Sequence, residues 1–254
     1  MTVQVHDQFE YQNDLYRISA VSDELHFFEI GDVGLFTMFS NTACWRGYVA
    51  IFAIDDAKRL VLKTLHANPV NFNTPDGKKL ILLLEERTRL LEEYQQKCST
   101  SLEERILDLN RKIGFYTNWK RENACKTIED APKINNIIPK KRPEDNSQNS
   151  SLYFYEDYLY ENIQVPISYT GSLLICKDFI EDCYVHMGFQ SPMSFKTVIE
   201  LEFEQGKLRK ETDRSEQAER YRNSEKPSRN ENMVQWIDEC FDLGFSAKWN
   251  FDEE

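Results

Sequence analysis

Hydrophobic and polar residues alternate through the first part of the chain in the manner of β-strands. Residues 48–54 are apolar on both alternating faces, which is typical of a central strand buried on both sides. A polar reversal follows, and residues 59–65 alternate charged side chains with Val and Leu, so the two runs predict a β-hairpin. The turn residues Asn13-Asp14 separate two further β-prone runs. Residues 1–77 are therefore predicted to form a β-rich half.

The pattern then changes to helical spacing. Apolar residues recur at intervals of three and four along 79–98, and a capping box of Ser101 and Glu104 opens a second such segment, 101–113. Two helices joined by a short turn predict an antiparallel helical hairpin, inserted over 78–131. A hairpin with one apolar stripe more often docks on its own domain, but a partner-binding arm has the same sequence pattern, so both interpretations stay open.

Strand-like patterning returns in the last third of the chain. Pro, Asn, Ser and charged residues fill 132–151, which predicts a linker, and 152–210 is predicted to be a second β-rich half. In its clearest hairpin, 196–210, apolar and acidic positions alternate before a Gln-Gly turn. The tail, 211–254, is predicted to contain a helix over 231–243 with one apolar face.

These elements predict an α+β fold with two antiparallel β-rich halves, an inserted helical hairpin and a C-terminal helix. The hairpins at 46–63 and 196–210 share an alternating strand, a short polar reversal and a basic return strand. An internal pseudo-repeat explains this likeness, and so does the general similarity of any two β-hairpins.

Charge is distributed unevenly among these segments. The chain of 254 residues has a formal net charge of −12 and a pI of about 5.0. This balance argues against a general nucleic-acid binder, because phosphate contacts need clustered Lys and Arg. The β-rich halves and the tail carry the acidic excess, whereas 67–150 is slightly basic and contains Lys140-Lys141-Arg142. A nucleic-acid contact is therefore expected only within 78–142.

The sequence predicts a soluble protein of the cytoplasm with no membrane partner. Residues 1–10 contain neither a basic nor an apolar signal segment, and no apolar run approaches the roughly 20 residues that cross a bilayer. The six cysteines form no CxxC pair, so they are expected to be reduced thiols.

The chain has four histidines, which restricts His-based acid–base and metal chemistry. His6 and His66 are expected to face solvent. Cys176, Cys183 and His186 have the spacing C-x6-C-x2-H, whereas structural zinc sites contain closely spaced ligand pairs. No metal and no cofactor are therefore expected.

Cys44 and His186 supply the residue types of a cysteine nucleophile and its base. Arg46 would favour the thiolate, and Asp178 or Asp182 would orient the imidazole. The alternative is that Cys44 is a small buried hydrophobe. The chain has no GxSxG, P-loop, GxGxxG or HExxH motif. The sequence therefore favours a protein without enzymatic activity over an enzyme, and both interpretations stay open.

Two sets of residues are candidates for binding. A pocket between the β-rich halves would suit a nucleotide-like ligand and would be lined by Cys44, Trp45, Arg46, Tyr169, His186 and Phe189. A partner protein would contact the acidic stripe Glu200, Glu202 and Glu204, and Trp236 on the C-terminal helix, which could also form an oligomer contact. The stripe is equally explained as a solvated strand face.

Three segments resemble those of uncharacterised small bacterial proteins of mixed α and β type. They are CWRGYVAIFAI (44–54), YTGSLLICKDFI (169–180) and YVHMGF followed by TVIELEFEQGKL (184–208). The resemblance covers the two β-rich halves and leaves out the helical hairpin. It implies a bacterial or phage setting and brings no activity and no site residue.

The sequence as a whole favours a non-catalytic protein-binding module that neutralises or regulates a cytosolic partner, such as a toxin or a component of a defence system. Acidic charge, an aromatic content of 13% and the lack of a catalytic constellation motivate this prediction. The partner is expected to be another protein of basic character. The alternative is an enzyme or a nucleotide-binding protein that uses the pocket between the halves.

Overall fold

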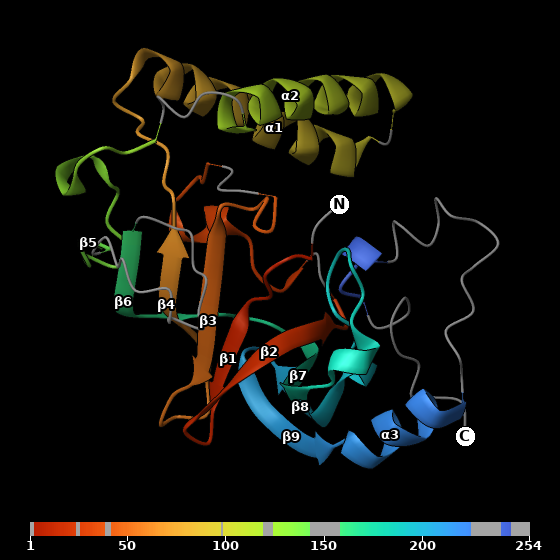
Figure 1. The fold of residues 1–254 in the computed structure, drawn as a ribbon. Coiled ribbons are helices and arrows are strands. Elements are labelled where there is room, and N and C mark those ends of the chain that lie inside the picture. Colours follow the sequence, from red (N-terminus) through yellow and green to blue (C-terminus); the bar gives the residue numbers. More distant parts are fainter. Residues whose placement is uncertain are drawn as a thin grey trace.

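The molecule is built on a nine-stranded mixed β-sheet (Figure 1). The computed structural model describes residues 3–23, 26–38, 42–97, 99–118, 124–142, 158–224 and 240–244. The strands lie in the order β5-β6-β4-β3-β1-β2-β7-β8-β9. They are β1 (Gln8–Tyr11), β2 (Asp14–Val21), β3 (Tyr48–Ile54), β4 (Leu60–Ala67), β5 (Lys140–Lys141), β6 (Tyr158–Pro166), β7 (Gly171–Phe179), β8 (Phe195–Glu204) and β9 (Lys207–Asp213). The helices are α1 (Pro75–Gln96), α2 (Thr100–Asn118) and α3 (Ser215–Ser224).

Strand β3 lies inside the sheet, as its apolar run predicts. It pairs antiparallel with β4 and parallel with β1, and none of its residues is exposed. The turn from β1 to β2 places Gln12 and Asn13 at φ of 50° and 64°, the sign that a tight hairpin turn requires. The pairing of β1 with β3 makes the sheet mixed, where the sequence had predicted antiparallel halves.

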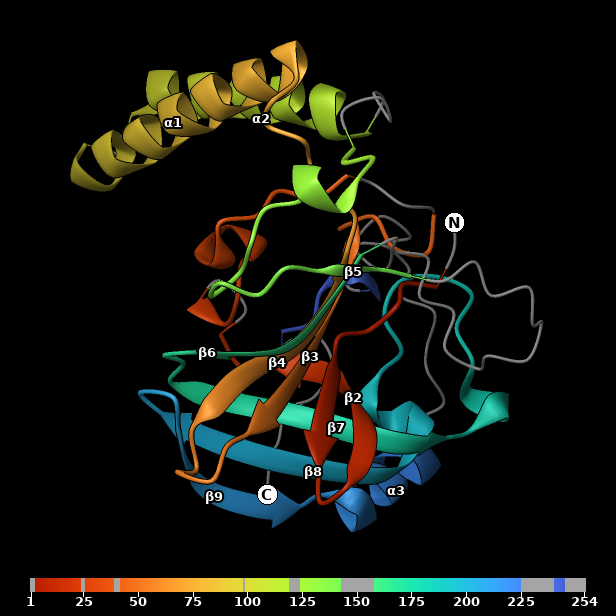
Figure 2. The ribbon, with the colours of Figure 1, turned by 90° about the vertical axis from the view of Figure 1, so that its left-hand side faces the viewer.

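The sheet curls until two of its turns meet. Leu60 N–H donates to Gly206 O at 2.7 Å, and Leu60 O accepts the Ile167 N–H at 3.0 Å. Gly206 has a φ of +73°, and a Cβ there would lie 2.3 Å from Ile167 O, so glycine is required. Figure 2 shows β3 and β4 crossing over β7 and β8. The largest apolar cluster joins residues of both groups, including Phe52 and Leu201.

The helical hairpin stands off the sheet (Figures 1 and 2). Thr74 caps α1 by accepting a backbone N–H at 2.9 Å, and Pro75 begins the helix. At the base, Leu80 packs with Met38. Further out, the two helices pack on each other through a cluster of their own, formed by Leu83, Leu90, Tyr94, Leu102, Ile106 and Leu109. We call residues 75–118 the arm and the other described residues the body.

The last described helix, α3, lies against β8. Its buried Ala218 packs in an apolar cluster with Leu174, Phe195 and Val198. The helix predicted over 231–243 falls largely on residues outside the described ranges, and so does Trp236.

The α+β class with an inserted helix pair and a C-terminal helix is confirmed. The two β-rich parts share one sheet, because β6 pairs with β4 while β7 pairs with β2. Part of the segment predicted as a linker packs on this sheet: Ile134 is 2% exposed and β5 pairs with β6. Among the described residues, no helix is both long and apolar enough to cross a membrane.

Candidate functional site

Residues 44–48 form a tight turn that buries an ion pair. Gly47 has a φ of +68°, and a Cβ there would lie 1.8 Å from Met38 O, so no other residue fits. The turn brings Arg46 to Asp7, with Nη1 donating to Oδ2 at 2.5 Å. Two residues far apart in the sequence thus form the polar centre of this end of the sheet.

The Arg46–Asp7 pair is partly shielded from water, with the Arg46 side chain 28% exposed. The Asp7 side chain is 10% exposed, and its Oδ1 accepts the Ala50 N–H at 2.8 Å. The guanidinium carbon lies 4.9 Å from the Tyr48 ring centre and 5.6 Å from that of Phe189. Burial alone lowers the pKa of Arg46, but Asp7 and Tyr48 outweigh it and raise that pKa above its ordinary value. The guanidinium stays charged and links β3 to the residues before β1.

His6 is buried next to this pair, so the prediction that it faces solvent is wrong. Its Nε2 accepts the Gln190 N–H at 3.0 Å, and its Nδ1 lies 2.8 Å from Ile18 O. These partners fit the neutral tautomer with the proton on Nδ1. His66 is also largely buried, and burial, together with Arg142, lowers its pKa to about 4.

Cys44 and His186 lie in different environments. Cys44 is buried with Val5 and Val49, and its thiol donates to Tyr48 O at 3.3 Å. His186 is exposed, and its ring centre lies 4.9 Å from that of Tyr184. A reactive cysteine needs an accessible sulfur, so this geometry does not favour a nucleophile at Cys44. The described ranges hold no group of three His, Cys, Asp or Glu placed to bind a metal ion.

Tyr169 and Trp45, both proposed for one pocket, differ in burial. Tyr169 is fully buried in the main core, its ring centre 5.2 Å from that of Phe27, and its hydroxyl donates to Ser172 O at 3.2 Å. Trp45 is 51% exposed and stacks on Phe241 with ring centres 5.5 Å apart. Tyr169 therefore belongs to the core and Trp45 to the surface.

Residues 240–244 return to the body beside Trp45, and we call them the C-terminal clasp. Phe189 N–H donates to Cys240 O at 2.7 Å. Gly188, at a φ of +64°, lies so close that a Cβ would be 1.9 Å from the same oxygen. The glycine thus allows the clasp to sit against the loop that carries Phe189.

The acidic stripe of β8 is paired within the chain. Glu200 is 6% exposed and accepts from Arg214 Nη2 at 2.7 Å. Glu202 and Glu204 pair with basic side chains of β9 at 2.9 and 2.8 Å. A basic partner would have to displace these cations, so the stripe is a weaker binding surface than its sequence indicates.

The arm exposes apolar side chains. Leu82 on α1 is 64% exposed and Leu107 on α2 is 51% exposed. Residues 75–118 contain eight acidic and eight basic side chains, so the arm is neutral overall and the remaining residues carry the full charge of −12. The sequence had left open whether this hairpin docks on its own chain. In the structure the base of the arm packs on the body, and the outer faces of its helices are exposed to solvent.

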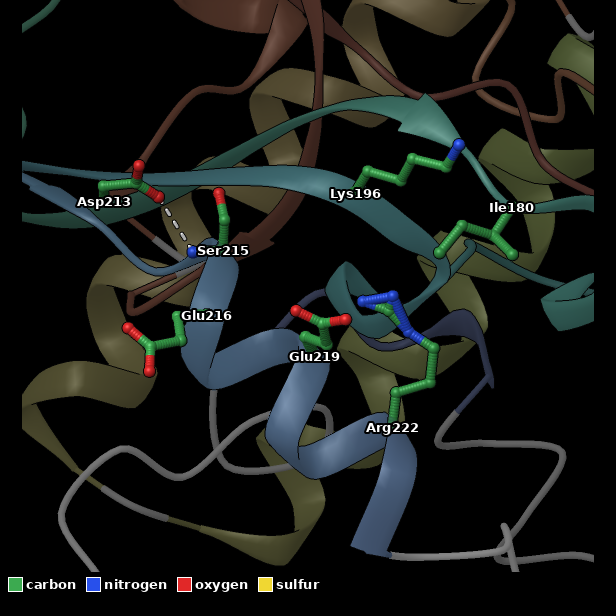
Figure 3. A pocket seen from close by; sticks show the side chains of 7 residues that line it. All are labelled: Ile180, Lys196, Asp213, Ser215, Glu216, Glu219 and Arg222. Carbon is green, nitrogen blue, oxygen red and sulfur yellow. Dashed lines mark hydrogen bonds between the residues drawn. The ribbon is translucent and has the colours of Figure 1, made fainter.

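A basin of about 750 Å³ lies beside α3, at the surface of β8 and β9 (Figure 3). Its lining combines both signs of charge: Ile180, Lys196, Asp213, Ser215, Glu216, Glu219 and Arg222. The sequence marks 211–222 as a charged run, but it does not reveal the basin, because Lys196 reaches it only through the packing of α3 on β8.

A smaller hollow, of about 430 Å³, lies where the arm meets the body. Aromatic and charged side chains line it together, including Phe28, Phe36, Tyr48, Asp32 and Arg87. Arg87 Nε donates to Asn110 Oδ1 at 2.7 Å, so part of this lining is held within the arm.

The arm and the basin are two described surfaces that remain open to a partner or a ligand. Neither receives a function from a related protein, since no protein-family model, no curated protein and no solved structure matches the chain.

Proposed function

We propose that this protein is a non-catalytic binding module that neutralises or regulates a basic protein, such as a toxin or a component of a defence system. In this proposal the arm is the surface that binds the partner. The arm is the observation that carries the proposal. Its helices of 22 and 19 residues contact the body at their base and leave Leu82 and Leu107 exposed. Such helices are typical of recognition in which a partner's apolar groove receives the helix.

The division of charge favours a basic protein over a second copy of this chain. The arm is neutral, so it can enter an apolar groove without a large excess of one sign of charge. The acidic body attracts a basic partner at long range, whereas two acidic bodies repel each other. The partner is therefore a protein with an apolar groove flanked by Lys and Arg.

The proposal includes a cytoplasmic setting. No disulfide joins any two of the five described cysteines, Cys44, Cys125, Cys176, Cys183 and Cys240. Free thiols are the usual state in a reducing compartment.

The test compares three baits: the wild-type protein, the arm variant Leu82→Arg/Leu107→Arg, and the control Leu15→Arg. Leu15 is 41% exposed on the body, so it matches the arm leucines in chemistry and exposure. A protein retained from host extract by wild type and control, but lost with the arm variant, is then purified and titrated. We expect a basic protein whose affinity falls at least about tenfold in the arm variant, since burying one leucine stabilises by about 1.5–3 kcal/mol.

Two results overturn the proposal. Equal retention by wild type and arm variant places the contact elsewhere on the molecule. Concentration-dependent dimerisation in analytical ultracentrifugation, abolished by the arm variant, identifies a second copy of the chain as the occupant of the arm. Unfolding curves of the three baits verify that each is folded, because substitutions at exposed sites change stability by only about 0.5 kcal/mol.

A further inference from the structure

The charged side chains of the basin beside α3 do not pair with one another. Within the described ranges, Lys196, Glu216, Glu219 and Arg222 form no ion pair shorter than 4.0 Å, whereas the three glutamates of the neighbouring β8 stripe all do. Exposed side chains gain little from pairing across water, so these charges stay solvated when no opposite charge lies within reach. The basin therefore presents charges that are available to a ligand.

Arg222 gives an independent sign of a missing partner. Its Nη2 donates to Phe195 O at 3.3 Å, but its Nε is buried and has no hydrogen-bond acceptor. A buried donor without an acceptor is costly, and native structures rarely leave one. Because this Nε is closed to solvent, a ligand in the basin would meet the guanidinium through those Arg222 atoms that line the basin.

The basin has a basic side and an acidic side. In Figure 3 the amine of Lys196 extends toward Ile180 and the guanidinium of Arg222 extends toward Glu219, while Asp213 and Glu216 lie at the opposite side. At the start of α3 the Ser215 N–H is not available to an anion, because it already donates to Asp213 Oδ1 at 2.9 Å. An anionic group is therefore expected only at the Lys196 side.

We propose that the basin binds a short peptide with free ends, its carboxylate held by Lys196 and Arg222 and its ammonium group held by Asp213 and Glu216. A purely anionic ligand would meet three carboxylates, and a purely cationic one would meet two cations. The volume of about 750 Å³ is within the usual range for a ligand site, and extended residues add about 3.3–3.6 Å each, so two to four residues fit.

The experiment titrates the full-length protein calorimetrically with trialanine, N-acetyl-trialanine and trialanine amide. Both ends should contribute, so each blocked peptide is expected to bind about 3- to 10-fold more weakly than trialanine. Lys196→Gln is expected to weaken the binding of trialanine by a similar factor and to leave the affinity for trialanine amide unchanged. Glu216→Gln should show the reverse pattern, losing affinity for trialanine but not for the acetylated peptide.

Lys196 and Glu216 are exposed, so these variants test binding without disturbing the fold. Matched controls are Lys207→Gln and Glu129→Gln, which change exposed charges outside the basin and should leave all three affinities unaltered. The proposal is overturned if no heat of binding is detected at about 10 mM trialanine, a concentration far above the dissociation constant of a specific complex. It is also overturned if the three peptides bind equally, or if the basin variants behave like the controls. None of these three results affects the role proposed for the arm.

Discussion

The body and the arm are stabilised by different kinds of contact. In the body, long-range packing buries ion pairs such as Arg46–Asp7 within a sheet that joins distant parts of the chain. In the arm, the apolar cluster lies between two consecutive helices, and the Asp108–Lys112 pair is open to solvent. Local contacts of this kind open with a smaller free energy than a whole sheet does. A partner can therefore bind the arm without disturbing the body.

The largest effect is expected from Asp7→Ala. This variant leaves the largely buried Arg46 guanidinium with Val5 O but without its carboxylate, which should lower the free energy of unfolding by about 3–5 kcal/mol. Urea denaturation followed by tryptophan fluorescence measures the loss. The matched control is Asp108→Ala, which removes an exposed carboxylate from the arm and should leave the urea midpoint unchanged. Equal urea midpoints for the two variants would show that the Arg46–Asp7 pair contributes no more to stability than the exposed Asp108–Lys112 pair.

Leu90→Ala tests whether the arm opens on its own. Leu90 is 4% exposed in the arm cluster, and its truncation should destabilise that cluster by about 2–5 kcal/mol. Hydrogen exchange should then accelerate at amides in 75–118 while β3 and β7 keep their protection. Loss of protection in those strands to the same extent would mean that arm and body unfold as one unit.

Acid should weaken the body through His66. Burial lowers the pKa of His66 from 6.5 to about 4, so the unfolded chain binds more protons than the folded one between these values. Stability contributed by the neutral ring is present above pH 6.5 and is lost as the pH falls toward 4, by up to about 3 kcal/mol. Between pH 6.5 and 4, the free energy of unfolding should change less with pH in His66→Gln than in the wild-type protein. The exposed His186→Gln should keep the wild-type slope, and the arm contains no histidine.

Local pattern predicted the elements of both regions, because strand and helix periodicity depend on neighbouring residues. The predicted strand 48–54 is β3. The second helix is also found, but it begins at Thr100, so Ser101 lies inside α2 and is not the N-cap that its sequence predicted. The sites depend on pairs that local pattern does not reveal. Nothing near Asp7 in the sequence indicates that Arg46 will pair with it, and the N–H that donates to the buried His6 ring comes from the distant Gln190.

The smallest effect is expected from Gly188→Ala, which tests whether the body also contains a part that can detach, the C-terminal clasp. In Gly188→Ala, a methyl group at a φ of +64° would lie 1.9 Å from Cys240 O, so the C-terminal clasp must move away or the loop must strain, at a cost of about 1–3 kcal/mol. We expect faster hydrogen exchange at 240–244 and altered fluorescence of Trp45, which stacks on Phe241. The control Gly31→Ala meets no atom within 4 Å and should leave both signals unchanged. If the clasp keeps its protection in Gly188→Ala, other contacts hold it, and the arm remains the one separable region that these variants identify.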